Sequence, residues 1–218
     1  MDRTRLVEAC QALPLFPLPG TVLMPGSLLP LHVFEPRYRQ LVSDCLRDHV
    51  PLSVPQLRPD EETDSTGRPA FYPYASVGLI GAHQELADGR FNVLVQPLAR
   101  IRIVEERSTT RLYRIARAIV LVDEHVPRDE LATVGERVRG VFAPLVGRMG
   151  QVGEGVARAL RSLPAERVSE AVASVVLRAD DLRQAFLSEN NPVRRAMMVE
   201  TSVLTLLAEV GGTQTAEA

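Results

Sequence analysis

The chain has 218 residues, 45% of them apolar, and a formal net charge of −2, so it is long enough to bury one large core or two smaller ones. Its two cysteines are too few for a disulfide framework or a cysteine-rich zinc site. The sequence contains no lysine, which excludes a Walker A motif, Schiff-base catalysis and a Ser–Lys dyad.

Neither a membrane span nor a secretory signal is evident. No stretch approaches the ~18–20 uninterrupted apolar residues of a spanning helix. Residues 1–8 lack the apolar core and the cleavage site of a signal peptide. We therefore expect a cytoplasmic protein with no membrane partner.

The composition changes part-way along the chain. Twelve of the 16 prolines lie in the first 100 residues, whereas Ala, Val, Leu, Glu and Arg recur at helical spacing from about residue 128. This change predicts an α+β protein, with a β domain over residues 1–124, an α-helical subdomain over 125–210 and a disordered tail over 211–218.

The first part is predicted to contain short strands and one helix. Apolar runs predict strands at residues 13–18, 27–33 and 52–57. Pro36 suits the first turn of a helix, and apolar residues follow it at three- and four-residue intervals, which predicts a helix over residues 36–48. The polar residues 58–69 are expected to form a loop.

A hairpin is the clearest local signal. Asp88-Gly89 lies between two runs of strand character and is typical of a type I′ turn. Alternation of apolar and polar residues continues after the turn until Pro97, which predicts a bend or bulge there. Residues 112–122 form a further predicted strand. Six or seven curved strands and one helix indicate a small barrel.

Helices are predicted throughout the second part. The first begins near Pro127 and is expected to kink or end at Pro144. Shorter helices follow at residues 154–162, 164–176 and 180–188. A longer one begins with Asn191 as its cap and Pro192 at its first position, and runs to about residue 210.

Residues 13–41 read LPLFPLPGTVLMPGSLLPLHVFEPRYRQL, and residues 88–96 read DGRFNVLVQ. These blocks resemble the signature of the Lon substrate-binding domain family. The resemblance implies a PUA-like β-pseudobarrel with one short helix, followed by a C-terminal α-helical bundle. It also implies non-catalytic recognition of unfolded or tagged polypeptide segments, possible cooperation with a separate protease, and no cofactor.

The candidate binding residues lie in the first of these blocks and are His32, Phe34, Glu35, Arg37, Tyr38 and Arg39. One interpretation makes His32 and Glu35 an acid–base pair, or Arg37 a clamp for a carboxylate. The other is structural, with Glu35 and Pro36 beginning the helix. The absence of an accompanying nucleophile or oxyanion donor favours the structural interpretation, so no catalytic residue is assigned and the chain is not predicted to be an enzyme.

Two alternative functions remain open, an RNA-binding module and a small hydrolase. The RNA alternative depends on a basic stretch that comprises Arg100, Arg102, Arg107, Arg111, Arg114 and Arg117. Glu105 and Glu106 interrupt it and the isoelectric point is about 6.1, so we expect a solvated face instead. The scattered histidines predict no metal site. Cys45 is expected in the core, and Cys10 in a mobile N-terminal stretch.

Overall fold

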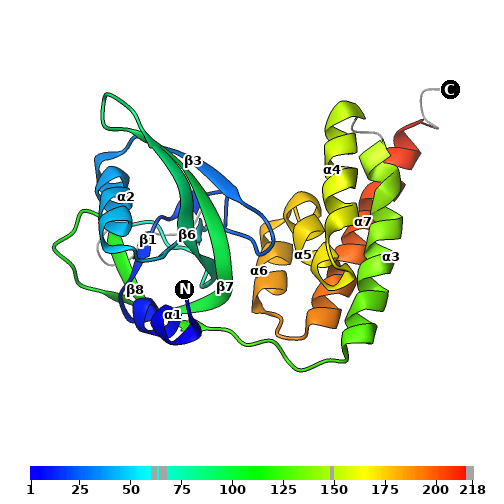
Figure 1. Cartoon of the computed structure of the whole chain (residues 1–218), viewed down its shortest axis with the longest axis horizontal. Coiled ribbons are helices and arrows are strands. Elements are labelled where there is room, and N and C mark those ends of the chain that lie inside the picture. The colour runs from blue at the N-terminus through cyan, green and yellow to red at the C-terminus, as the bar shows by residue number, and fades with distance from the viewer. Residues whose placement is uncertain (60–62, 64–67, 148–149, 215–218) are drawn as a thin grey trace. The chain divides into compact units, whose positions relative to one another are not determined.

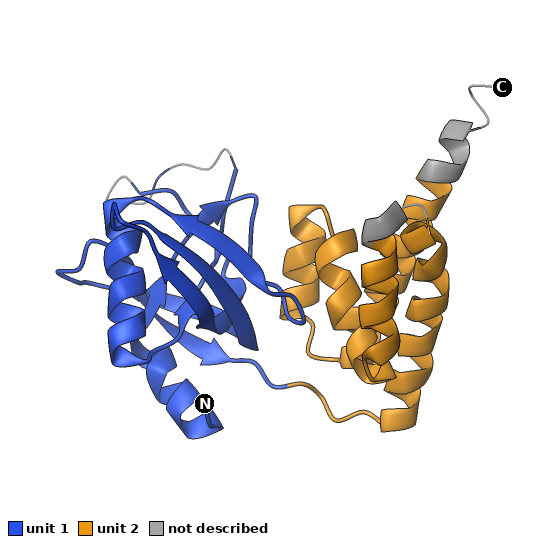
Figure 2. Cartoon of the chain, turned by 45° about the horizontal axis from the view of Figure 1, so that its top comes forward, with its two compact units in different colours: residues 1–122 blue, residues 123–218 orange. Residues whose placement is uncertain are grey.

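The computed structural model describes residues 1–59, 63, 68–147 and 150–214, and the chain divides into two compact units, Met1–Val122 and Asp123–Ala218 (Figure 2). The elements of the first unit are α1 (Arg3–Ala9), η1 (Cys10–Ala12), β1 (Leu13–Leu15), β2 (Leu18–Pro19), β3 (Leu29–Val33), α2 (Pro36–Asp48), β4 (Leu52–Ser53), β5 (Gln56–Leu57), β6 (Tyr74–Glu85), β7 (Phe91–Arg107) and β8 (Arg114–Val120). Those of the second are α3 (Arg128–Gly147), α4 (Gly150–Ser162), α5 (Ala165–Val176), α6 (Asp180–Ser188) and α7 (Pro192–Gln214) (Figure 1).

Five strands of the first unit close into a barrel. They follow the order β7-β6-β4-β1-β8, and pairing of β8 with β7 completes the ring. β7 is long enough to pair with β3 along residues 91–95 and with β8 along residues 101–107. The α+β architecture expected from the sequence is therefore confirmed.

β7 bends at the predicted place. Val77 pairs with Ala99 and Gly78 pairs with Pro97, which leaves Leu98 without a partner in β6. Such a bulge accommodates a proline, which has no N–H to donate to the ladder, and it increases the local twist that barrel closure requires.

The β6–β7 turn differs from the expected type I′ turn. Gly89 N–H donates to Leu86 O and Leu86 N–H donates to Arg90 O, each at 2.8 Å. Gly89 has a φ of 76°, but Asp88 has no positive φ. These bonds define a type I turn over residues 86–89 that is followed by a bulge at Gly89. The loop is therefore longer than the two-residue loop that was expected at Asp88-Gly89.

Helix α2 has the predicted bounds and covers the barrel core. It begins with Pro36 in its first turn and ends at His49, which adopts a left-handed conformation with a φ of 53°. Its buried residues Leu41, Val42 and Cys45 join the cluster formed by the inner faces of the strands. The core position expected for Cys45 is confirmed, and burial raises the pKa of its thiol to about 12.

Two predicted strands are each broken in two. The segment 13–18 forms β1 and β2, and the segment 52–57 forms β4 and β5. Pro17 and Pro55 lie at the breaks and cannot donate to a ladder. β1 and β4 therefore pair within the barrel, while β2 and β5 form a separate two-stranded sheet.

The expectation of a mobile segment around Cys10 is wrong. Asp2 caps α1 by accepting a hydrogen bond from Arg5 N–H at 2.9 Å, and the chain then continues through η1 into β1. Cys10 is fully buried, and burial raises the pKa of its thiol to about 11. This thiol is a core group.

The second unit confirms most of the predicted helices. Asn191 caps α7, because its Oδ1 accepts hydrogen bonds from Val193 N–H and Arg194 N–H at 3.0 and 3.1 Å. Pro144 does not end α3, which continues for three more residues to Gly147. Because two glycines weaken an established helix without ending it, α7 continues past residue 210 to Gln214. The remaining residues of the expected tail, 215–218, lie outside the described residues.

An ion pair between a buried arginine and a half-exposed aspartate holds the start of the second unit. The Arg195 side chain is 4% exposed, and its Nη1 and Nη2 donate to the two carboxylate oxygens of Asp123 at 2.8 and 2.7 Å. Among the described residues, no helix is both long and apolar enough to cross a membrane, and no group of three or more His, Cys, Asp or Glu residues could hold a metal ion.

Candidate functional site

The six residues singled out in the sequence are divided among separate surfaces of the first unit. One hollow of about 710 Å³ is lined by three of them, Glu35, Arg37 and Tyr38. Arg39 lines a second hollow, beside the β6–β7 turn, and His32 lines a third, formed by β3, β6 and β7. Phe34 lines none of these three and is 60% exposed. The division arises because the chain passes from β3 into α2, where successive side chains rotate by about 100°.

His32 belongs to a polar row across three strands. Its Nδ1 lies 2.8 Å from Asn92 Oδ1, and Asn92 Nδ2 donates to Gln84 Oε1 at 3.4 Å. Arg90 Nη1 lies 3.4 Å from His32 Nε2, which fits the tautomer with its proton on Nδ1. Glu35 forms an ion pair with Arg37 instead, so His32 and Glu35 do not form the acid–base pair considered above.

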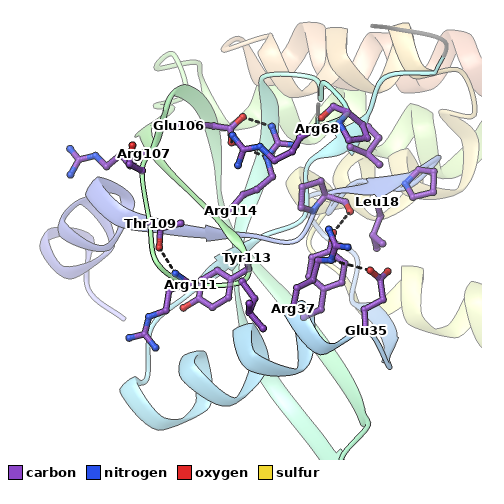
Figure 3. A pocket seen from close by; sticks show the side chains of 17 residues that line it. Leu18, Glu35, Arg37, Arg68, Glu106, Arg107, Thr109, Arg111, Tyr113 and Arg114 are labelled. Atoms are coloured by element: carbon purple, nitrogen blue, oxygen red, sulfur yellow. Dashed lines mark hydrogen bonds and ion pairs between the residues drawn. The ribbon is translucent and has the colours of Figure 1, made fainter. Parts of the chain in front are cut away.

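The hollow lined by Glu35, Arg37 and Tyr38 is the candidate site (Figure 3). It brings together residues 17–19, the start of α2 and residues 106–114, which are distant in sequence. Its apolar lining comprises Pro17, Leu18, Pro19, Leu57 and Leu112. Its cationic lining comprises Arg37, Arg68, Arg107, Arg111 and Arg114.

Tyr38 forms an ordered part of the lining. Its ring stacks on Phe16 with centroids 3.9 Å apart, and its hydroxyl donates to Pro17 O at 3.2 Å. Burial, followed by the negative charge of Glu35, raises the pKa of this hydroxyl, and Arg37 opposes the shift. The Tyr38 side chain is therefore neutral and held in a fixed position, and one face of its ring packs against Phe16.

Arg114 forms the most deeply buried part of the cationic lining and is 12% exposed. Its Nε donates to Glu106 Oε2 at 2.8 Å, its Nη2 pairs with Glu106 Oε1, and its Nη1 donates to Pro69 O at 2.7 Å. Its guanidinium lies 4.4 Å from the centroid of the Phe71 ring. Arg68 adds a second ion pair to Glu106 at 3.4 Å. Both oxygens of the Glu106 carboxylate are thus occupied.

Asp44 of α2 holds the loop between β7 and β8. Its buried carboxylate accepts from Arg111 Nη1 and from the Tyr113 hydroxyl, both at 2.9 Å. Between these two residues, Leu112 N–H donates to Gln40 Oε1 at 2.9 Å. Burial and the hydrogen bond to Asp44 raise the pKa of Tyr113. Three successive loop residues are therefore fixed to one helix.

The lining suits binding better than catalysis. Its aliphatic hydroxyl groups belong to Ser108 and Thr109, and no histidine or cysteine is among the described residues that line the hollow. Thr109 Oγ1 accepts from Arg111 N–H at 3.0 Å. A hydroxyl without an adjacent base is a poor nucleophile, whereas guanidinium groups beside apolar side chains can bind a ligand that carries both acceptors and hydrocarbon.

The basic stretch forms the expected solvated face only in part, because Arg102, Arg107 and Arg111 are exposed whereas Arg114 is 12% exposed. Three of its members, Arg107, Arg111 and Arg114, line the hollow. Arg100 is only 6% exposed, and Arg117 pairs with Glu105 at 3.5 Å. Strand alternation and the β7–β8 loop direct these side chains differently. The contribution of Arg68 was missed, because nothing local in the sequence relates it to α2.

Comparison with known proteins identifies relatives over most of the chain. The family model of the ATP-dependent protease La (LON) substrate-binding domain matches residues 12–204. Lon protease 2 of Sorangium cellulosum is 28% identical over 212 residues, 96% of this chain, and Lon protease 1 of Herpetosiphon aurantiacus is 25% identical over 209 residues, 93% of this chain. The chain spans 26% and 24% of the lengths of these relatives.

Solved structures show the same fold. The N-terminal domain of the Mycobacterium avium complex Lon protease superposes with a TM-score of 0.68 at 12% identity, over 88% of this chain and 97% of that one. The Lon N-terminal domain protein from Xanthomonas campestris gives a TM-score of 0.58 at 25% identity, over 90% of this chain and 97% of that one.

Proposed function

The chain belongs to the LON substrate-binding domain family, and from this we propose that it binds unfolded or tagged polypeptide segments without cleaving them. In this role it delivers or retains clients beside a separate protease in the cytoplasm. The proposed binding site is the hollow formed by residues 17–19, α2 and residues 106–114.

The observation that carries the proposal is the chemical composition of this hollow. Leu18, Leu57 and Leu112 provide hydrocarbon surface, and Leu112 is 63% exposed. Arg37, whose side chain is 59% exposed, provides N–H donors at the same surface. An extended polypeptide offers the complementary groups, aliphatic side chains and unpaired carbonyl oxygens. Folded proteins bury most of both, so such a site favours unfolded segments.

The dimensions of the hollow also support recognition of a short segment. A volume of about 710 Å³ lies within the range of small-ligand sites and accommodates a few side chains. The hydrogen bonds from residues 111–113 to α2 fix one wall before a ligand arrives, which reduces the entropic cost of binding.

Leu112→Ser tests the proposed site. We expect a fluorescent, permanently unfolded polypeptide of zero net charge to bind the variant about fivefold more weakly, because the leucine no longer buries hydrocarbon on binding. Ile119→Ser is the matched control, since Ile119 is 50% exposed and lies outside the hollow. Fluorescence anisotropy measures the affinities, and mass spectrometry verifies that the polypeptide stays intact.

Equal weakening by the two substitutions would place the binding surface elsewhere. Cleavage of the polypeptide by the purified protein would contradict the non-catalytic role.

A further inference from the structure

One edge of β3 has no strand beside it. In the part of the chain that the structure describes, β3 ends the six-stranded sheet, lies outside the barrel ring and pairs with β7. Pro30 and His32 of this strand are exposed. An unpaired edge presents backbone donors and acceptors, so it can act as a template for another extended segment.

The β6–β7 turn determines which backbone groups of β3 face this edge. Leu86 N–H donates to Arg90 O at 2.8 Å, and hydrogen-bonded pairs alternate along an antiparallel ladder. Between residues 91 and 95, the even-numbered residues of β7 therefore bond to β6, and the odd-numbered ones bond to odd-numbered residues of β3. Pro30 and His32 consequently face the unpaired edge, where the missing N–H of a proline costs no ladder bond.

The backbone groups at this edge lie beside apolar side chains. His32 offers an N–H donor and a carbonyl acceptor, and Pro30 offers a second carbonyl acceptor. Leu28 and Phe34 flank the strand and are 52% and 60% exposed. The Phe34 ring stacks beside the His32 ring with centroids 6.2 Å apart. An extended polypeptide carries the complementary groups, because it presents main-chain donors and acceptors along each edge and side chains on both faces.

We infer that β3 binds an extended client segment as an added strand; this inference rests on the proposed function and gives it a main-chain contact in addition to the hollow. A client strand can donate to Pro30 O and His32 O and accept from His32 N–H. A second copy of β3 is a poorer occupant, because its own Pro30 lacks an N–H and the pair forms fewer bonds. The preferred clients are therefore proline-free segments of high β-propensity.

N-methylated peptides test strand addition. The reference peptide is short and alternates valine with threonine. One analogue carries methyl groups on the amides along one edge, and we expect it to bind the full-length protein within about twofold of the reference, because its other edge can still pair. A second analogue is methylated on every amide. We expect it to bind at least about tenfold more weakly, since it cannot donate to Pro30 O and His32 O. It keeps the side chains and carbonyl oxygens that the hollow is proposed to recognise.

Hydrogen exchange at the His32 amide locates the contact. In the unliganded protein this amide faces the unpaired edge, whereas the amides of Leu31 and Val33 face β7. With the reference peptide at about ten times its Kd, we expect NMR to show about tenfold slower exchange of the His32 amide, because exchange then proceeds from the unbound protein. This measurement needs no altered protein.

A proline substitution tests the same amide from the protein side. His32→Pro removes the N–H that faces the unpaired edge and leaves the bonds to β7 in place. His32→Ala is the matched comparison, because it removes the same side chain and keeps the amide. We expect the reference peptide to bind His32→Pro about fivefold more weakly than His32→Ala, which is the effect of one hydrogen bond. Thermal unfolding verifies that both variants fold.

The outcomes separate this inference from the proposed function. Unchanged exchange of the His32 amide at saturating peptide overturns strand addition at β3, as does equal affinity for the reference and fully methylated peptides or for the two His32 variants. Protection of this amide that rises with protein concentration in the absence of peptide would overturn it in favour of a second copy. Binding of a permanently unfolded polypeptide but not of the reference peptide overturns it too, and leaves the proposed function intact. Binding of neither contradicts the proposed function itself.

Discussion

At the scale of single residues, the candidate site depends on a carboxylate outside its lining. Asp44 is buried and accepts hydrogen bonds from Arg111 and Tyr113, while its second oxygen pairs with Arg47 at 2.8 Å. A buried carboxylate with several charge-assisted partners stabilises each of them, and its loss leaves them without an acceptor. Asp44 therefore positions the loop that carries Leu112.

Asp44→Ala tests this positioning role. The substitution leaves the buried Tyr113 hydroxyl without its acceptor, so we expect the free energy of unfolding to fall by about 2–3 kcal/mol. Urea unfolding measures this loss, and amide hydrogen exchange at residues 111–113 reports the loosened loop. Asp48→Ala is the control on the same helix, because Asp48 is exposed and bonds to Arg47; we expect it to leave stability nearly unchanged. Equal losses of unfolding free energy in Asp44→Ala and Asp48→Ala would contradict the positioning role of Asp44.

Three of the six candidate binding residues named from the sequence line the hollow. Glu35, Arg37 and Tyr38 lie in one motif, and the structure places them in one hollow. The other lining residues come from segments that no local pattern connects, such as Leu18 and Arg114. Their proximity results from pairing of β1 with β8, which is non-local. Only knowledge of this long-range strand pairing could have placed Leu18 near Arg114.

At the scale of elements, local chemistry determined where helices begin, whereas tertiary packing determined which contacts they make. Asn191 and Pro192 mark the start of α7, and Pro36 marks that of α2. Gly135 illustrates the effect of tertiary packing. It lies within α3, where a Cβ atom would collide with the backbone carbonyl of Ala165. The close approach of α3 and α5 thus requires a glycine at this position.

Gly135→Ala tests this helix contact. Alanine favours a helix over glycine by about 1 kcal/mol, but here the collision involves backbone, so we expect net destabilisation by about 1–3 kcal/mol. Gly140 provides the matched control in the same helix, since nothing beyond the adjacent backbone of its own helix and its two chain neighbours lies within 4 Å of the position of its Cβ. We expect Gly140→Ala to raise the midpoint of thermal unfolding and Gly135→Ala to lower it. A rise in both would show that the two helices can separate without cost.

Strand boundaries were predicted less well than helix boundaries. The apolar runs at residues 13–18 and 52–57 were identified, but each divides at a proline between two sheets. An apolar run reports burial, and it does not report which neighbour a strand pairs with. The bulge at Pro97 was predictable because a proline disrupts any antiparallel ladder in the same way.

At the scale of the whole molecule, the two units differ in how far their folds follow from local pattern. Helices of the second unit follow from periodicity and caps along contiguous segments. Closure of the barrel in the first unit requires β1 to pair with both β4 and β8 across long stretches of sequence. The shift in composition therefore predicted the fold class and the run of short curved strands predicted a barrel, whereas the order in which those strands pair could not be predicted from local pattern. The fold persists at 12% identity in a solved relative.

The most direct test of the central claim compares two ligands of the unaltered protein, a permanently unfolded polypeptide of zero net charge and a single-stranded RNA of similar length. Anisotropy titrations at low salt and at about 1 M salt distinguish apolar from purely electrostatic binding. We predict that the polypeptide binds under both conditions, because hydrocarbon burial does not depend on ionic screening. Binding of RNA alone, lost at high salt, would contradict polypeptide recognition.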